Sequence, residues 1–213
     1  MRVVVAPAPF KGVCAGPVAA RAIAAGVRLG VLGAETVVLA VADGGEGTRD
    51  ALVAGRAGQV RAFAVHDPLD RPISGAVGLL PGHAAVVELA TASGYERLAE
   101  GERDPEQTST YGTGELIRAC LDFSPTRIVV AVGGSATNDG GMGLVRALGG
   151  RFLDAAGREL RGVGADLAAV ATIAHRHGAM VIDDLGSGAF LDTAAFGLAH
   201  EPTPIERLAQ GAD

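Results

Sequence analysis

The chain has little of several residue types that would indicate particular protein classes. None of its 213 residues is tryptophan, 4% are aromatic, and Lys11 is the single lysine. The two cysteines, Cys14 and Cys120, have no CxxC partner, so the sequence indicates neither a zinc knuckle nor a disulfide framework. A net charge of −6 without clusters of basic residues argues against a nucleic-acid surface. We therefore expect no nucleic-acid partner.

Long apolar runs and a signal-peptide profile are also missing. No stretch reaches the roughly 20 apolar residues that a membrane helix needs, so we expect no membrane partner and a cytoplasmic protein. Glycine, in contrast, is abundant, with 32 residues, and 48% of the chain is hydrophobic. This composition supports a large core and an α/β fold with many tight turns.

A buried strand, a glycine-rich loop and a helix follow one another between residues 128 and 150. Ile128 to Val132 is a continuous β-branched run, typical of a parallel strand covered on both faces. It leads into GGSATNDGG, in which glycines permit close backbone approach and polar side chains suit a substrate or a metal-bridged phosphate. The loop matches neither the Walker A nor the GxGxxG motif, and its polar residues could instead only cap the next helix. We favour a phosphate- and substrate-binding loop. Its candidate residues are Gly133, Gly134, Ser135, Thr137, Asn138 and Asp139.

Two earlier strands also lead into loops that carry charged residues. A strand at residues 2–6 precedes Lys11 and a helix that opens at Gly16-Pro17, and a strand at residues 36–41 precedes ADGGEGT and a helix at residues 51–54. Because ligands of open α/β sheets bind beyond the carboxyl ends of strands, we expect these loops to converge with the 133–143 loop. The alternative is that the carboxylates only favour a helix N-terminus. The candidates in the second loop are Asp43, Gly44, Gly45, Glu46 and Thr48.

The middle of the chain has the pattern of a β-meander. Strands are predicted at residues 59–65, 76–80 and 84–90, and Glu88 lies within the last of them. A carboxylate in an apolar strand is either paired or functional, and the sequence favours neither.

A hydroxyl-rich segment, residues 108–113, precedes a predicted helix at residues 114–123 whose first turn contains Glu115. Thr110 and Thr113 either cap this helix or contact an anion.

The motifs APxxFKG, ADGGEGT, DPLDRPI, TSTYGTGELI and GGSATNDGGMG, in this order, resemble the glycerate kinase family over residues 1 to about 168. The resemblance implies a two-domain α/β fold with a parallel or mixed sheet and glycine-rich βα loops. It also implies transfer of the γ-phosphoryl group of ATP to D-glycerate, with Mg²⁺. In that family role, Lys11 would bind phosphate or carboxylate, and Asp43 or Asp139 would bind the metal or act as base.

Two departures from the family pattern stand out. Ala8 and Pro9 occupy the place of an Asp-Ser pair. After about Ala168 the family resemblance ends, and the tail resembles a piece of L-seryl-tRNA(Sec) selenium transferase, a pyridoxal-phosphate enzyme, with Asp183 at the position that pairs with the pyridinium nitrogen. No lysine follows Lys11, so the tail cannot form the aldimine. His175 and His177 in the tail are expected to be surface residues without a metal.

These observations lead to three hypotheses about organisation and function. We expect residues 1–168 to be a partial glycerate kinase of two interleaved α/β subdomains with its C-terminal part missing, and residues 169–213 to be a joined fragment. The first functional hypothesis is an ATP-dependent glycerate kinase that forms 2-phosphoglycerate from small-molecule substrates. The alternatives are a non-catalytic remnant that binds an anion without turnover, and a fragment of a selenium transferase.

Overall fold

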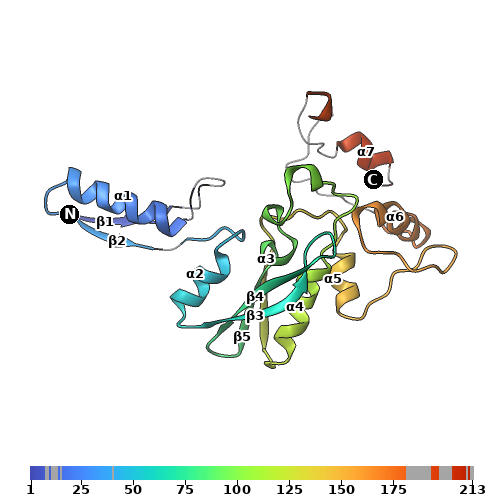
Figure 1. Ribbon diagram of the computed structural model, residues 1–213, viewed down its shortest axis with the longest axis horizontal. Helices are drawn as coiled ribbons and strands as arrows, with labels where there is room; N and C mark the ends of the chain where they lie inside the picture. The colour runs from blue at the N-terminus through green and yellow to red at the C-terminus, as the bar shows by residue number, and fades with distance from the viewer. Residues whose placement is uncertain are drawn as a thin grey trace.

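The computed structural model describes residues 1–7, 10, 14, 16–39, 41–180, 193–196, 203–209 and 211. These residues form helices and two β-sheets, which confirms the predicted α/β class (Figure 1). In chain order the elements are β1 (Arg2–Val5), α1 (Gly16–Gly30), β2 (Glu35–Val38), α2 (Thr48–Gly55), β3 (Gln59–His66), β4 (Pro72–Leu80), β5 (Ala84–Glu88), α3 (Ala90–Ser93), α4 (Tyr111–Leu121), β6 (Arg127–Ala131), α5 (Met142–Ala147), α6 (Leu167–Arg176) and α7 (Pro204–Ala209). Short 3-10 helices span Tyr95–Arg97, Glu100–Glu102, Gly164–Asp166 and Thr193–Phe196.

The first sheet is a βαβ unit. β1 and β2 are parallel, in a register that runs from Arg2 opposite Glu35 to Val5 opposite Val38. α1 lies against them through a small cluster of Val5, Ala20 and Ala24. Figure 1 shows this unit at one end of the molecule, from which the chain continues into α2 and the second sheet. The strand–helix–strand order predicted from the sequence is therefore present.

The second sheet has the strand order β3-β4-β5-β6. β3, β4 and β5 form the predicted antiparallel meander, and β6 adds parallel to β5. α4 packs on one face, where Leu116 and Cys120 are fully buried against Val77 and Val87. Burial raises the pKa of the Cys120 thiol to about 11. The main core of the described structure is thus the contact between α4 and the meander.

The opposite face of this sheet is covered by α2. Gly75 and Gly78 of β4 lie on opposite faces because their sequence separation is odd. A Cβ atom on Gly75 would meet Leu116 of α4, whereas one on Gly78 would lie 2.7 Å from the Val53 side chain of α2. The sheet therefore lies between α4 on one face and α2 on the other. The loop at residues 43–48 leads directly into α2.

The structure contradicts one prediction about β6. The stretch Ile128 to Val132 was expected to be covered on both faces, yet the side chains of Val129, Val130 and Val132 are 38%, 37% and 65% exposed. Within the described residues, β6 is the last strand of its sheet and pairs with β5 alone. An apolar, β-branched run shows that a strand can be buried, but the covering layer must come from elements elsewhere in the sequence.

Several predicted features of the termini lie outside the described residues. They include Lys11, the Ala8-Pro9 pair and Asp183. His175 and His177 lie at the end of α6 and are exposed. Among the helices in the described part, none has the length and apolar character that crossing a membrane would need.

Candidate functional site

The loop after β2 and the loop after β6 are in direct contact. The backbone N–H of Gly133 donates to the carbonyl oxygen of Gly44 over 2.8 Å. A Cβ atom on Gly133 would lie 2.7 Å from the nitrogen of Gly45, so only glycine permits this approach. The two loops converge as expected from the sequence, although they follow strands of different sheets. The third expected contributor, Lys11, lies outside the described residues.

The loop at residues 43–48 presents two carboxylates around a rigid turn. Gly44 and Gly47 have φ angles of 95° and 89°, in the left-handed region that favours glycine. The Thr48 hydroxyl is buried; it accepts a hydrogen bond from the Gly44 N–H and donates to the Gly45 carbonyl over 2.7 Å. Thr48 therefore shapes the loop.

Asp43 differs from Thr48 because its side chain is exposed. Its Oδ1 accepts one hydrogen bond, from the N–H of Gly45 at 3.0 Å. The carboxylate of Glu46 is half-buried, and a Cβ on Gly134, whose φ is 73°, would clash with it. The carboxylate of Asp43 is thus available to a ligand, and Glu46 extends from the same loop to the start of the loop after β6.

A pocket of about 360 Å³ lies next to these loops, and its lining includes Glu46, Arg49, Glu88 and Arg97. The buried Glu88 carboxylate accepts a 2.9 Å hydrogen bond from the backbone N–H of Arg49 at the start of α2. An anion is favoured at a helix N-terminus, and here the protein supplies it from β5. Of the two roles that the sequence left open for Glu88, the structure shows pairing. Arg49 and Arg97 are not among the residues predicted from the sequence. The one signal that could have indicated Arg49 is its position directly after ADGGEGT.

Asp139 is a buried connection between two segments. Its side chain is 1% exposed. Oδ2 accepts hydrogen bonds from the Thr110 N–H and hydroxyl, each at 2.8 Å, and from the Gly143 N–H at 3.0 Å. Oδ1 accepts from the Gly141 N–H at 3.0 Å. Both oxygens are therefore occupied by donors that hold the starts of α4 and α5 together.

The hydroxyl groups predicted to bind a ligand divide into two kinds. Thr113 is buried and its hydroxyl bonds that of Ser93 at 2.8 Å, while the Thr110 hydroxyl also accepts from the N–H of Leu144. These two side chains join elements of the fold. In the loop after β6, Ser135 is exposed and Thr137 partly so, and their hydroxyls lie 3.0 Å apart; Asn138 is half-buried beside them. Ser135 and Thr137 are thus the accessible hydroxyls among the candidates.

Glu115 lies later in α4 than predicted. The helix begins at Tyr111, so Glu115 is in its second turn and not at the N-terminus. Its carboxylate accepts from the backbone N–H of His66 at 2.8 Å and contacts the His66 ring nitrogen Nδ1 at 3.0 Å. Helix-dipole stabilisation was therefore the wrong explanation for this residue.

Comparison with known proteins gives a consistent result for most of the chain. The sequence model of the glycerate kinase family matches residues 3–193. Glycerate kinase of Bacillus subtilis (strain 168) is 42% identical over 174 residues, which are 81% of this chain and 46% of that protein. Glycerate 2-kinase of Escherichia coli (strain K12) is 42% identical over 161 residues, 75% of this chain and 42% of that protein. This chain thus spans less than half the length of these relatives.

A solved structure gives the same assignment. A crystal structure described as glycerate kinase 2 of Salmonella typhimurium LT2 superposes with a TM-score of 0.65 at 32% identity, covering 99% of this chain and 60% of that one. The family match reaches residue 193, beyond the limit near residue 168 expected from the motifs. The comparisons do not show the expected selenium transferase resemblance of the tail. The chain belongs to the glycerate kinase family.

Proposed function

We propose that this chain phosphorylates D-glycerate with ATP and releases 2-phosphoglycerate and ADP. The observation that carries the proposal is the hydrogen-bonded contact between the loops at residues 43–48 and 133–139, which carry the exposed carboxylate of Asp43 and the exposed hydroxyl of Ser135. Family membership supports the same reaction. In the transfer, a glycerate hydroxyl oxygen bonds to the γ-phosphorus, the bond to the β-phosphate bridging oxygen breaks, and the hydroxyl proton passes to a carboxylate.

The candidate residues are assigned different parts in this reaction. Phosphoryl transfer needs positioning and charge neutralisation more than covalent chemistry. Asp43 accepts the hydroxyl proton or binds the metal, because its carboxylate is exposed and has one internal hydrogen bond. Ser135 and Thr137 donate to phosphate oxygens, and Lys11 supplies a positive charge. Asp139 positions the loop, since four donors within 3.0 Å already occupy its carboxylate.

Mg²⁺ and ATP fit the donor set of this site. Mg²⁺ in kinases is held by one or two carboxylates together with phosphate oxygens and waters, and it seldom has a cage made only by protein. Asp43 and Glu46 provide two carboxylates on one loop, while the described residues contain no group of three or more His, Cys, Asp or Glu that could hold a metal. The ion would neutralise charge on the transferred phosphoryl group.

A coupled ADP-release assay with D-glycerate and Mg-ATP tests the proposal. We expect turnover above that of a Lys11→Ala variant, and phosphorus NMR of the product should show the 2-phosphate ester. Turnover equal to the Lys11→Ala background would contradict the proposal and favour the non-catalytic alternative. We further propose that residues 169–213 perform no pyridoxal-phosphate chemistry, because the only lysine is Lys11. Incubation with pyridoxal phosphate should then give no aldimine absorbance from the tail.

A further inference from the structure

Residues 88–95, which run from the last residue of β5 through α3, are bonded to the loop after β6 by their backbone. The N–H of Tyr95 donates to the carbonyl oxygen of Gly134 at 2.9 Å. The N–H of Ala136 donates to the carbonyl oxygen of Ser93 at 3.0 Å. One of the two contacting loops is therefore fixed to this segment by hydrogen bonds that do not depend on side chains.

The same segment holds the other contacting loop, residues 43–48, through the side chain of Glu88. Glu88 is 5% exposed, and its carboxylate accepts the 2.9 Å hydrogen bond from the backbone N–H of Arg49, the second residue of α2. The loop leads into α2 and is bound to its first turn, because the Thr48 hydroxyl bonds two backbone groups of the loop. The position of this first turn therefore determines the position of the Asp43 carboxylate.

The negative charge of Glu88 strengthens this connection. The N-terminus of a helix favours an anion, and a hydrogen bond to a charged acceptor is roughly twice as strong as one to a neutral acceptor. Among the described residues the Glu88 carboxylate makes no ion pair, and the guanidinium of Arg49 contacts Asp50 at 2.8 Å instead. The charge of Glu88 thus acts on the start of α2 and on no other described cation.

The direct contact between the two loops is made largely by glycine backbone. The N–H of Gly133 bonds the carbonyl oxygen of Gly44, and Gly45 lies against Gly133. Glycine has no side chain that could lock the register of one loop against the other, and its backbone has many accessible conformations. Their register therefore depends on the elements that hold each loop from outside, and residues 88–95 hold both.

We infer that Glu88 is a positioning residue for phosphoryl transfer. Through the Arg49 N–H it keeps the loop that carries Asp43 in register with the loop after β6. This role rests on the proposed function of the two loops, and it involves no contact between Glu88 and the reacting groups. Misplacement of a reacting group by about 1 Å can lower turnover about a hundredfold, so a residue outside the reaction can control its rate.

Amide hydrogen exchange, followed by NMR on the full chain without substrates, tests this register directly. Glu88→Leu is similar in size and removes the acceptor. We expect the Arg49 N–H to exchange about tenfold to a hundredfold faster than in wild type, the range for a lost bond to a charged group. The Gly133 N–H, which bonds the other loop, should exchange at least about threefold faster. Faster exchange at Arg49 with an unchanged rate at Gly133 would show that the bond stabilises α2 alone, and would overturn the inference.

Glu88→Gln retains a neutral acceptor oxygen and provides the conservative comparison. Its Arg49 N–H should exchange about fivefold faster than in wild type, and its Gly133 N–H about twofold faster. Urea unfolding shows whether each variant folds. If Glu88→Leu does not fold, an unchanged Gly133 rate in Glu88→Gln overturns the inference.

Turnover provides a second readout. Glu88→Leu should lower kcat for ADP release at least about tenfold and change the KM for D-glycerate less than about threefold, since register matters most in the transition state. Glu88→Gln should keep kcat within about threefold of wild type. An unchanged kcat in folded Glu88→Leu would overturn the inference. No ADP release by wild type would refute the proposed function, while the exchange rates would still show whether Glu88 sets the register of the loops.

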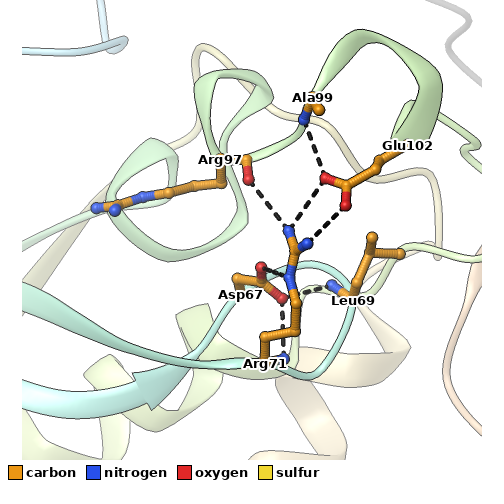
Figure 2. A network of polar contacts seen from close by, with 6 residues as sticks. All are labelled: Asp67, Leu69, Arg71, Arg97, Ala99 and Glu102. Carbon is orange, nitrogen blue, oxygen red and sulfur yellow. Dashed lines mark hydrogen bonds and ion pairs between the residues drawn. The ribbon is translucent and has the colours of Figure 1, made fainter.

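Glu102→Gln is the matched control, because Glu102 is also a carboxylate that accepts a backbone N–H. It accepts from Ala99 at 3.0 Å and from Nη1 of Arg71 at 2.7 Å, and the bond from Arg71 lowers its pKa. Figure 2 shows this network, which contains no residue of the two contacting loops. We expect Glu102→Gln to lower stability at pH 7 and to leave kcat and Gly133 exchange at their wild-type values. A tenfold loss of kcat in this variant as well would show that any lost carboxylate bond has the same effect, and would overturn the specific role of Glu88.

Discussion

Replacement of Asp139 by asparagine tests the assignment of this residue as a buried connection between the starts of α4 and α5. The change keeps the shape of the side chain and removes its charge. The best placement of the amide keeps its oxygen at the position of Oδ2 and turns its NH₂ group toward the N–H of Gly141, which now donates at 3.0 Å. One donor is then unsatisfied, at a cost of about 1–3 kcal/mol. The three bonds at Oδ2 persist with a weaker, neutral acceptor.

The expected loss of unfolding free energy is about 3 kcal/mol, because relief of a buried charge offsets part of the weakened bonding. Urea denaturation followed by circular dichroism should show a midpoint lower by roughly 1–2 M, given a typical dependence of about 2 kcal/mol per molar urea. The control is Asp43→Asn, whose side chain is exposed and accepts one hydrogen bond. It should change stability by less than about 0.5 kcal/mol. An Asp139→Asn variant with a wild-type midpoint and slope would refute the reasoning.

Three further predictions concern other parts of the structure. In the native protein at pH 8, iodoacetamide should modify the partly exposed Cys14 and leave Cys120 unmodified, since burial raises the Cys120 pKa to about 11; mass spectrometry showing rapid native labelling of Cys120 would contradict this. The lowered pKa of Glu102 means that its ion pair with Arg71 stabilises the fold above the unfolded-state pKa and is lost as pH falls through the folded-state value. Glu102→Gln should therefore lower Tm at pH 7 and match wild type at acidic pH, and an equal Tm difference at both would exclude a charge effect. Gly133→Ala should separate the two contacting loops and reduce turnover at least about tenfold, whereas Gly55→Ala, with open space around the added methyl, should not.

The sequence predicts which helices and strands form better than it predicts which of their faces are buried. The strand at residues 128–132 and the helix after it are present because a β-branched run followed by glycines and then helical spacing has few other local solutions. The exposure of Val129 and Val130 was not predictable, because cover depends on segments far away in the chain. The β-meander was predictable because its strands are consecutive, with turn residues between them.

In the candidate site, too, features set by neighbouring residues were predictable, and contacts between residues far apart in the sequence were not. The contact of the 43–48 and 133–139 loops follows from the general position of ligand sites at strand ends. That general position does not predict whether a given side chain in these loops faces solvent or the interior. Asp43 and Asp139 both follow strands into glycine loops, yet one is exposed and the other is bonded to Thr110, 29 residues earlier. Glu88 likewise bonds Arg49 across 39 residues, a pairing that residue types alone do not specify.

The most direct test of the central claim is the rate of ADP release with D-glycerate and Mg-ATP, measured for wild type and for Asp43→Asn side by side. The claim is that the contacting loops at residues 43–48 and 133–139 form the phosphoryl-transfer site. It predicts D-glycerate-dependent turnover by wild type and a loss of about 10²- to 10⁴-fold in Asp43→Asn, the usual range for removal of an acid–base group, with an unchanged urea midpoint. Equal rates for the two proteins, or no D-glycerate-dependent ADP release by folded wild type, would contradict it.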